Sequence, residues 1–185
     1  MTPYVMTETP FAARMLERLL STVKLPVHEV LHGGRKTGAV MRGNTVLNGW
    51  NAPVVVVVDA DSVEPANIWE QESGYRFLLP AGDFPGAPAE ILMAIPQVEA
   101  VLFGDHEGLE CILGRPLTER EKIEGEFRPR AVLDRLLADA GMDRDALLER
   151  ISPREAAQFA AHPLVQSLAA FIERAHAALA VADAA

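Results

Sequence analysis

Five consecutive valines, Val54 to Val58, constrain the fold of this chain more than any other stretch of its sequence. Valine is β-branched and fits the pleated surface of a strand. Because the run has no polar alternation, it predicts a strand covered on both faces, as in a parallel sheet with helices on each side. We therefore expect the central strand of an α/β domain here.

Two carboxylates follow this run. Asp59 and Asp61 stand at the expected carboxyl end of the strand, where open α/β sheets place their ligands. If the strand continues through Asp61, both side chains point to the same face. Two neighbouring anions repel each other, and a divalent cation with oxygen ligands relieves that repulsion. Aspartate is also an ordinary turn and capping residue after a strand, so the pair alone allows either interpretation.

The flanking segments predict strands and helices in alternation. This order indicates α/β architecture, with a four-stranded parallel sheet, right-handed crossovers and flanking helices. The further strands are predicted at 4–7, 27–31 and 91–95, and the helices at 10–20, 37–47, 65–79 and 97–103.

After residue 104 the strand pattern stops. We expect an α/β part over residues 1–104 and an all-helical C-terminal extension over residues 105–185. Gly, Pro and Asp separate the helices of the extension, and apolar residues at helical spacing supply their buried faces. These helices are predicted at 109–113, 130–140, 144–151, 153–161 and 164–182.

Composition narrows the class of protein. The 185 residues carry a net charge of −9, which argues against a protein that coats nucleic acid with a broad basic surface. Any contact with nucleic acid then has to be local or bridged by metal. No apolar run approaches the roughly 20 residues that span a bilayer, and the N-terminus has no signal pattern, so we expect a cytoplasmic protein without membrane contact. The single cysteine, Cys111, excludes an internal disulfide and is expected to be buried.

Further charged residues are expected at the edge of the sheet that holds Asp59 and Asp61. Glu8 ends the first strand, Arg35 and Lys36 follow paired glycines after the second, and Glu99 comes shortly after the fourth. Because the carboxyl ends of parallel strands meet at one edge, we expect an acidic cluster beside a small basic spot. A solvated glycine turn with two surface cations explains Arg35 and Lys36 equally well.

The order of these residues resembles the Toprim domain, which is shared by type IA and type II topoisomerases, primases, small ribonucleases and nucleases of the overcoming-lysogenisation-defect (OLD) family. The resemblance covers residues 4–104 and rests on Glu8 after the first strand and Asp59-Ala60-Asp61 after the third. The segments 32–36 (His-Gly-Gly-Arg-Lys) and 95–99 (Ile-Pro-Gln-Val-Glu) look most like the OLD branch. The resemblance implies that Glu8, Asp59 and Asp61 bind magnesium and carry phosphodiester chemistry, with Glu99 as a further ligand.

Two features depart from that family. Its first glutamate is usually followed by glycine, whereas Thr9 and Pro10 follow Glu8 here. OLD-type proteins usually carry an ATPase domain, but the spacing of a phosphate-binding P-loop is missing from this chain. A separate ATPase or another protein is therefore an expected partner.

These patterns predict a metal-dependent nuclease that cleaves phosphodiester bonds in DNA or RNA, with defence against foreign nucleic acid as one setting. The oxygen ligands of Glu8, Asp59, Asp61 and Glu99 suit Mg²⁺ or Mn²⁺, which neutralise charge on the reacting phosphate and activate water. Lys36 or Arg35 is then placed to stabilise charge on that phosphate.

Two other classes of function stay open. In the first, the sheet is a non-catalytic scaffold, and the acidic helical extension binds a partner protein. The second is phosphoryl transfer by a haloacid-dehalogenase-like enzyme, in which the first aspartate of an Asp-x-Asp pair is the nucleophile. That class usually carries the pair after its first strand, and here the pair follows the third.

Overall fold

The structure, a computed structural model, describes residues 1–79 and 87–182. These residues form a four-stranded, all-parallel sheet with strand order β2-β1-β3-β4, flanked by helices and followed by a helical C-terminal region. The predicted fold class is therefore confirmed. The strands are β1 (Tyr4–Thr7), β2 (Glu29–His32), β3 (Val54–Asp59) and β4 (Ala89–Ala94).

Strand β3 is central, as the valine run predicts. All six of its residues are buried, and it pairs with β1 on one side and β4 on the other. Val55 and Val57 belong to the hydrophobic core on one face of the sheet, whereas the three alternate valines belong to the core on the opposite face. Both faces of β3 are thus covered by apolar side chains.

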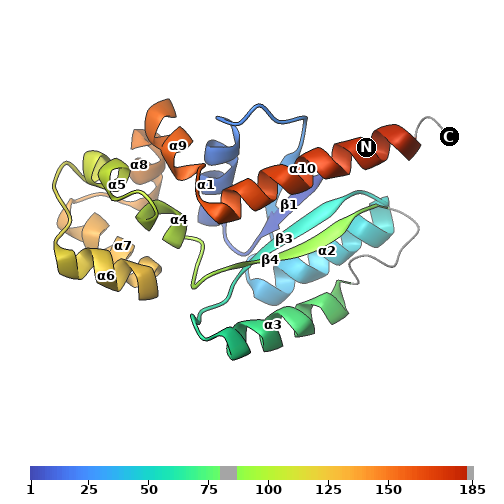
Figure 1. Ribbon diagram of the computed structural model, residues 1–185, viewed down its shortest axis with the longest axis horizontal. Coiled ribbons are helices and arrows are strands. Elements are labelled where there is room, and N and C mark those ends of the chain that lie inside the picture. The colour runs from blue at the N-terminus through green and yellow to red at the C-terminus, as the bar shows by residue number, and fades with distance from the viewer. Residues whose placement is uncertain (80–86, 183–185) are drawn as a thin grey trace.

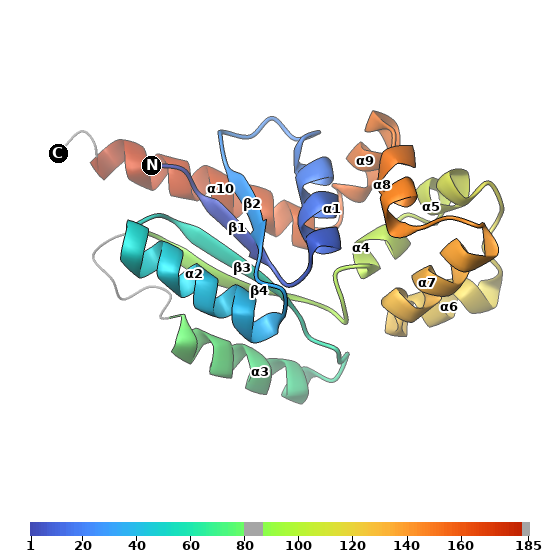
Figure 2. The same ribbon diagram turned by 180° about the vertical axis from the view of Figure 1, so that it is seen from behind.

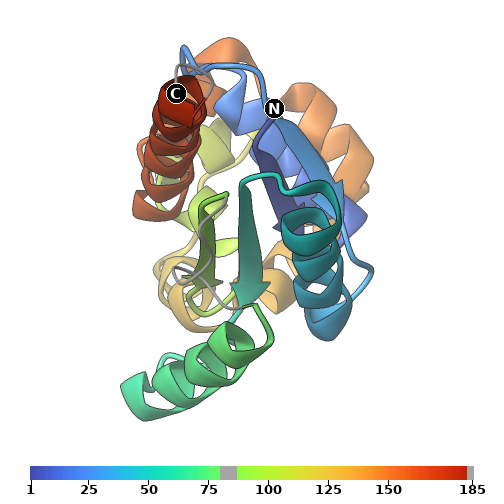
Figure 3. The ribbon, with the colours of Figure 1, turned by 90° about the vertical axis from the view of Figure 1, so that its right-hand side faces the viewer.

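Helices cover the two faces of the sheet (Figures 1 and 3). One face carries α1 (Pro10–Leu20) and α10 (Pro163–Ala182), and the other carries α2 (Lys36–Trp50) and α3 (Pro65–Leu78). From β1 the chain crosses to β2, towards one edge of the sheet. From β3 it crosses to β4, towards the opposite edge. The topological switch point, where such sheets bind their ligands, therefore lies between β1 and β3.

Short helices follow β4 and gather at the end of the sheet where the strands finish (Figures 1 and 2). None of the helices in the described part of the chain is long and apolar enough to cross a membrane. These short helices are α4 (Ala100–Phe103), α5 (His106–Leu113), α6 (Glu119–Phe127), α7 (Pro129–Asp139), α8 (Arg144–Arg150) and α9 (Pro153–Phe159).

The helix predictions for this region need two corrections. The helix predicted over 97–103 begins only at Ala100, because a turn at residues 95–99 separates it from β4. Helix α6 was not predicted, although Thr118 and Glu121 form a capping box at its start.

The helical C-terminal region shares one hydrophobic core with the sheet. Val57 of β3 and Leu16 of α1 belong to the same cluster of buried side chains as Leu136 of α7, Phe159 of α9 and Phe171 of α10. The region expected to form an extension therefore packs directly on the α/β part.

Helix α2 lies close to the sheet because a glycine stands at their contact. A Cβ atom added at Gly43 would lie 2.6 Å from Cγ2 of Val56. The glycines at 38 and 43 suggest a weak helix over 37–47, yet the helix extends from Lys36 to Trp50. Close packing on β3 outweighs the low helix propensity of glycine.

We expect Gly43→Ala to lower the free energy of unfolding by about 1–3 kcal/mol, because the added methyl group overlaps Val56. Gly49→Ala is the matched control in the same helix, since its Cβ would meet only Cγ2 of Thr45, at 3.8 Å. That control is expected to raise the free energy of unfolding by about 0.5–1 kcal/mol. Urea unfolding measures both, and equal effects would contradict the role assigned to Gly43.

Candidate metal centre

The predicted site residues converge where the parallel strands end. Glu8 follows β1, Asp59 ends β3, Lys36 begins α2 just after β2, and Glu99 follows β4. Glu8 and Asp59 flank the switch point between β1 and β3. The structure thus brings Glu8, Asp59, Asp61 and Glu99 to one edge of the sheet, and we call these four residues the acidic cluster.

Glu8 and Asp59 are buried side by side. Glu8 is 9% exposed and Asp59 is 3% exposed. The backbone N–H of Asp59 donates a hydrogen bond of 2.6 Å to Oε1 of Glu8. Burial raises the pKa of Glu8 to about 7, and repulsion from Asp59 and Asp61 acts in the same direction, against the lowering effect of the hydrogen bond. A cation beside Glu8 would relieve this repulsion.

Two donors fix the carboxylate of Asp59. Its Oδ1 accepts a hydrogen bond of 2.8 Å from the backbone N–H of Val98, and its Oδ2 forms an ion pair with Arg130. Burial, together with the charge of Glu99, raises the pKa of Asp59 by more than Arg130 and the Val98 N–H lower it. Asp59 is therefore held in one orientation, but its burial makes the charged form energetically unfavourable.

Asp61 has left the strand. β3 ends at Asp59, and Asp61 has a φ angle of 50°, in the left-handed region. Asp59 and Asp61 therefore do not continue one strand, so the condition under which both would point to the same face is not met. Nζ of Lys36 lies 2.7 Å from Oδ2 of Asp61, and Nε2 of Gln97 donates to Oδ1, also at 2.7 Å. Burial would raise the pKa of Asp61, but these two partners and the charge of Arg130 together lower it.

The paired glycines after β2 position Lys36. The N–H of Gly33 donates to the carbonyl oxygen of Thr7 at 2.8 Å, which ties this turn to the end of β1. Gly34 has a φ angle of 83°, a conformation that favours glycine. Helix α2 then begins at Lys36, whose ammonium group reaches Asp61, whereas Arg35 is exposed. The structure therefore favours Lys36 over Arg35 as the cation of this site.

Glu99 is bound by two arginines. Its Oε1 lies 3.0 Å from Nε of Arg130 and 2.9 Å from Nη1 of Arg144. The guanidinium of Arg130 also pairs with Asp59, so one side chain neutralises two buried carboxylates. Arg144 in turn lies over the ring of Phe11, 4.6 Å from its centroid. These contacts dock α7 and α8 against the end of the sheet.

Sequence reasoning missed Arg130, Arg144 and Gln97 as members of this site. Arg130 lies 71 residues after Asp59, and Arg144 lies 45 residues after Glu99, so no local spacing indicates the pairs. Gln97 lies inside the segment that resembles the OLD branch, and its place two residues before Glu99 was the available signal.

Within residues 1–79 and 87–182, no group of three or more His, Cys, Asp or Glu side chains is arranged to hold a metal ion. Mg²⁺ does not require such a cage, because it keeps several waters and binds through one or two carboxylates plus substrate phosphates. Glu8, whose pKa stays raised despite the nearby charge of Lys36, and the neighbouring Asp61 are the carboxylates that suit that mode. Asp59 and Glu99 already have guanidinium partners, and the metal-binding roles of all four carboxylates stay predictions.

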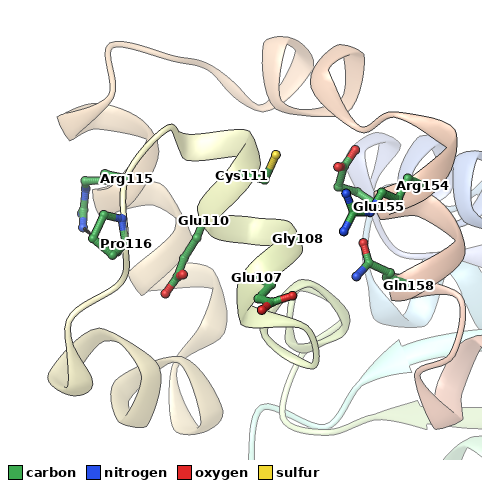
Figure 4. A pocket seen from close by; sticks show the side chains of 9 residues that line it. All are labelled: Glu107, Gly108, Glu110, Cys111, Arg115, Pro116, Arg154, Glu155 and Gln158. Atoms are coloured by element: carbon green, nitrogen blue, oxygen red, sulfur yellow. Dashed lines mark hydrogen bonds between the residues drawn. The ribbon is translucent and has the colours of Figure 1, made fainter.

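Two surface clefts are candidates for a binding site. A cleft of about 430 Å³ opens beside Asp61 and Arg130. Another, of about 410 Å³, lies between α5 and α9, where Glu107 and Cys111 face Arg154 (Figure 4). That second cleft contains no member of the acidic cluster, and Cys111 is exposed there, contrary to the buried role expected for it. The cleft beside Asp61 is therefore the one associated with the candidate metal centre.

Fold and site together define an α/β protein with an acidic cluster at the switch point of a parallel sheet. Comparisons with models of protein families, with curated proteins and with solved structures find no match to this chain.

We expect Arg130→Met to lower the free energy of unfolding by about 3–5 kcal/mol, because it leaves Asp59 and Glu99 as buried charges without their shared partner. Arg135→Met, in the same helix, is the matched control. Arg135 pairs with Glu124 at the surface, so its loss should cost no more than about 1 kcal/mol. Chemical denaturation compares the two, and similar losses would show that Arg130 does not hold the site together.

Glu8→Gln tests the raised pKa of Glu8. With a pKa of 4.5 in the unfolded chain and about 7 in the folded one, Glu8 binds its proton more tightly when folded. Its stabilising contribution is thus complete below pH 4.5 and is lost as the pH rises through about 7. We expect the variant to gain stability relative to the wild type from pH 4.5 to pH 8, by up to about 3 kcal/mol. Urea unfolding across this range measures the difference, and a constant difference would contradict the raised pKa.

Proposed function

We propose that this chain is a metal-dependent phosphodiesterase that cleaves nucleic acid at the acidic cluster. The crowding of Glu8, Asp59 and Asp61 at the switch point of the sheet is the observation that supports this best. Burial and mutual repulsion make Glu8 and Asp59 costly to keep charged, and a divalent cation offsets that cost. The same cation binds phosphate oxygens, which connects the site to phosphodiester chemistry.

Each residue has a role that follows from its contacts. Glu8 and Asp61 would hold Mg²⁺ or Mn²⁺, which when bound supplies a positive centre for the phosphate and an activated water. Asp59, fixed by Val98 and Arg130, keeps the backbone N–H that orients Glu8 in place. Lys36, already beside Asp61, is placed to donate to a phosphate oxygen.

The ion pairs favour a second candidate function. Arg130 and Arg144 neutralise Asp59 and Glu99, and Lys36 neutralises Asp61. An edge balanced in this way also suits a non-catalytic scaffold that binds a protein partner. A separate ATPase or another protein remains the predicted partner under either function.

The two functions are separated by titrating Mg²⁺ and Mn²⁺ in a calorimeter beside cleavage assays on supercoiled, linear and single-stranded substrates. Glu8→Gln and Asp61→Asn keep the shape of the side chains and remove their charge. We expect each to weaken metal binding by more than the roughly 10- to 100-fold that loss of an outer-shell partner costs, and to abolish cleavage. Glu64→Gln, at an exposed carboxylate just before α3, is the control and should change neither.

The outcomes differ clearly. Loss of binding and cleavage in both site variants, but not in the control, supports the phosphodiesterase. Metal binding without cleavage of any substrate favours the scaffold, or an enzyme that needs its partner. If the wild type binds neither ion, the proposed function is wrong.

A further inference from the structure

The cleft beside Asp61 adjoins a second, more apolar cleft. Their volumes are about 430 Å³ and about 390 Å³. Phe127, Arg128 and Ala131 line both, so the two adjoin at the turn between α6 and α7. We call these two adjoining clefts the α6–α7 groove; Asp61, at the candidate metal centre, lines the first of them.

The packing of α6 turns an aromatic ring into this groove. Phe127 is 56% exposed, and Ile123, one turn earlier, is 59% exposed. The buried contact of α6 is made by Gly125, where an added Cβ would lie 2.2 Å from the ring of Phe103. Each residue of a helix turns about 100° from the one before it, so side chains two residues apart point in nearly opposite directions. The close contact with Phe103 therefore directs Phe127 away from the core.

A cation stands next to that ring. Arg128 is exposed and takes part in no ion pair with the residues that the structure describes. The other charged side chains that line the groove beside the metal centre have partners. Arg130 binds two buried carboxylates, and the two acidic side chains are neutralised in the pairs Asp61–Lys36 at 2.7 Å and Asp134–Arg144 at 2.8 Å.

We propose that the α6–α7 groove binds single-stranded nucleic acid, with an unpaired base stacked on Phe127 and a backbone phosphate on Arg128. This inference rests on the proposed function, because the bound strand would be the substrate delivered to the acidic cluster. Stacking on an exposed aromatic ring beside a cation is how proteins hold single strands without reading their sequence. The groove also leads directly from Phe127 and Arg128 to Asp61.

The dimensions and charge of the molecule favour a single strand over a duplex. Clefts of roughly 300–1,000 Å³ hold small ligands, so each half of the groove suits about one nucleotide. Paired bases in a duplex are stacked on each other and do not offer their faces to Phe127. Duplex binding also draws on many phosphate contacts, and a chain with a net charge of −9 offers Arg128 as a local contact only.

The test is fluorescence anisotropy with dye-labelled oligothymidylate and oligouridylate, in EDTA and again in Ca²⁺. We expect Phe127→Ala to weaken binding roughly 5- to 100-fold, and Phe127→Trp to restore it, because the larger ring still stacks. Arg128→Ala should weaken binding and reduce the slope of log K against log salt by about 0.7, the value for one phosphate contact on a single strand. Phe77→Ala removes an 87% exposed ring on α3, outside the groove, and should leave binding unchanged.

Several results would overturn the inference. These are binding that is unchanged in Phe127→Ala, no binding of either oligonucleotide, or equal competition by an unlabelled duplex. Circular dichroism and the thermal midpoint confirm that the variants are folded. Failure of the proposed function gives a different result from failure of this inference. In that case metal binding or cleavage is absent, while oligonucleotide binding still depends on Phe127. The relative affinity for the two oligonucleotides distinguishes DNA from RNA.

Discussion

The guanidinium of Arg130 is the group on which the geometry of the site depends. It pairs with Asp59 at the end of β3 and with Glu99 after β4, while its backbone N–H donates to Oε1 of Gln97 at 3.3 Å. Asp59 and Glu99 are almost fully buried, and such carboxylates are strongly destabilising without a partner. Helix α7 must therefore stay docked at the end of the sheet. The helical C-terminal region is thus part of the site, since it supplies the cation that makes the acidic cluster tolerable.

The sheet was the part of the fold most open to prediction, because its signals are local. The valine run and the alternation of strands with helices follow from the period of apolar residues alone. Helix α6 shows where this reasoning stops. Gly125 is its buried residue, while Ile123 and Phe127 are exposed, so α6 lacks the apolar stripe that marks a surface helix. Its orientation is set by the contact with Phe103, which the order of residues in α6 does not reveal.

The residues of the site also divide into those that sequence patterns predict and those that they do not. The four carboxylates of the acidic cluster follow strand ends, so the topology of a parallel sheet is sufficient to bring them to one edge. Their partners depend on tertiary packing. The identity of the cation at Asp59 depends on where α7 lies, and the left-handed turn at Asp61 is accompanied by contacts with Lys36 and Gln97. Neither is encoded in a short motif, which is why the carboxylates were predicted and the guanidinium groups were not.

Charge is balanced unevenly across the acidic cluster, and the imbalance indicates where a ligand gains most. Asp59 and Glu99 each have a guanidinium partner, and Asp61 has the ammonium of Lys36. Glu8 accepts a backbone N–H, and the nearby charge of Lys36 does not offset its burial, so its pKa rises to about 7. An added cation therefore gains most between Glu8 and Asp61, next to the α6–α7 groove. A phosphate brought to this edge before that cation would add to the existing repulsion. Under the proposed function, metal binding should therefore strengthen substrate binding, and by linkage the substrate should strengthen the binding of metal by the same factor.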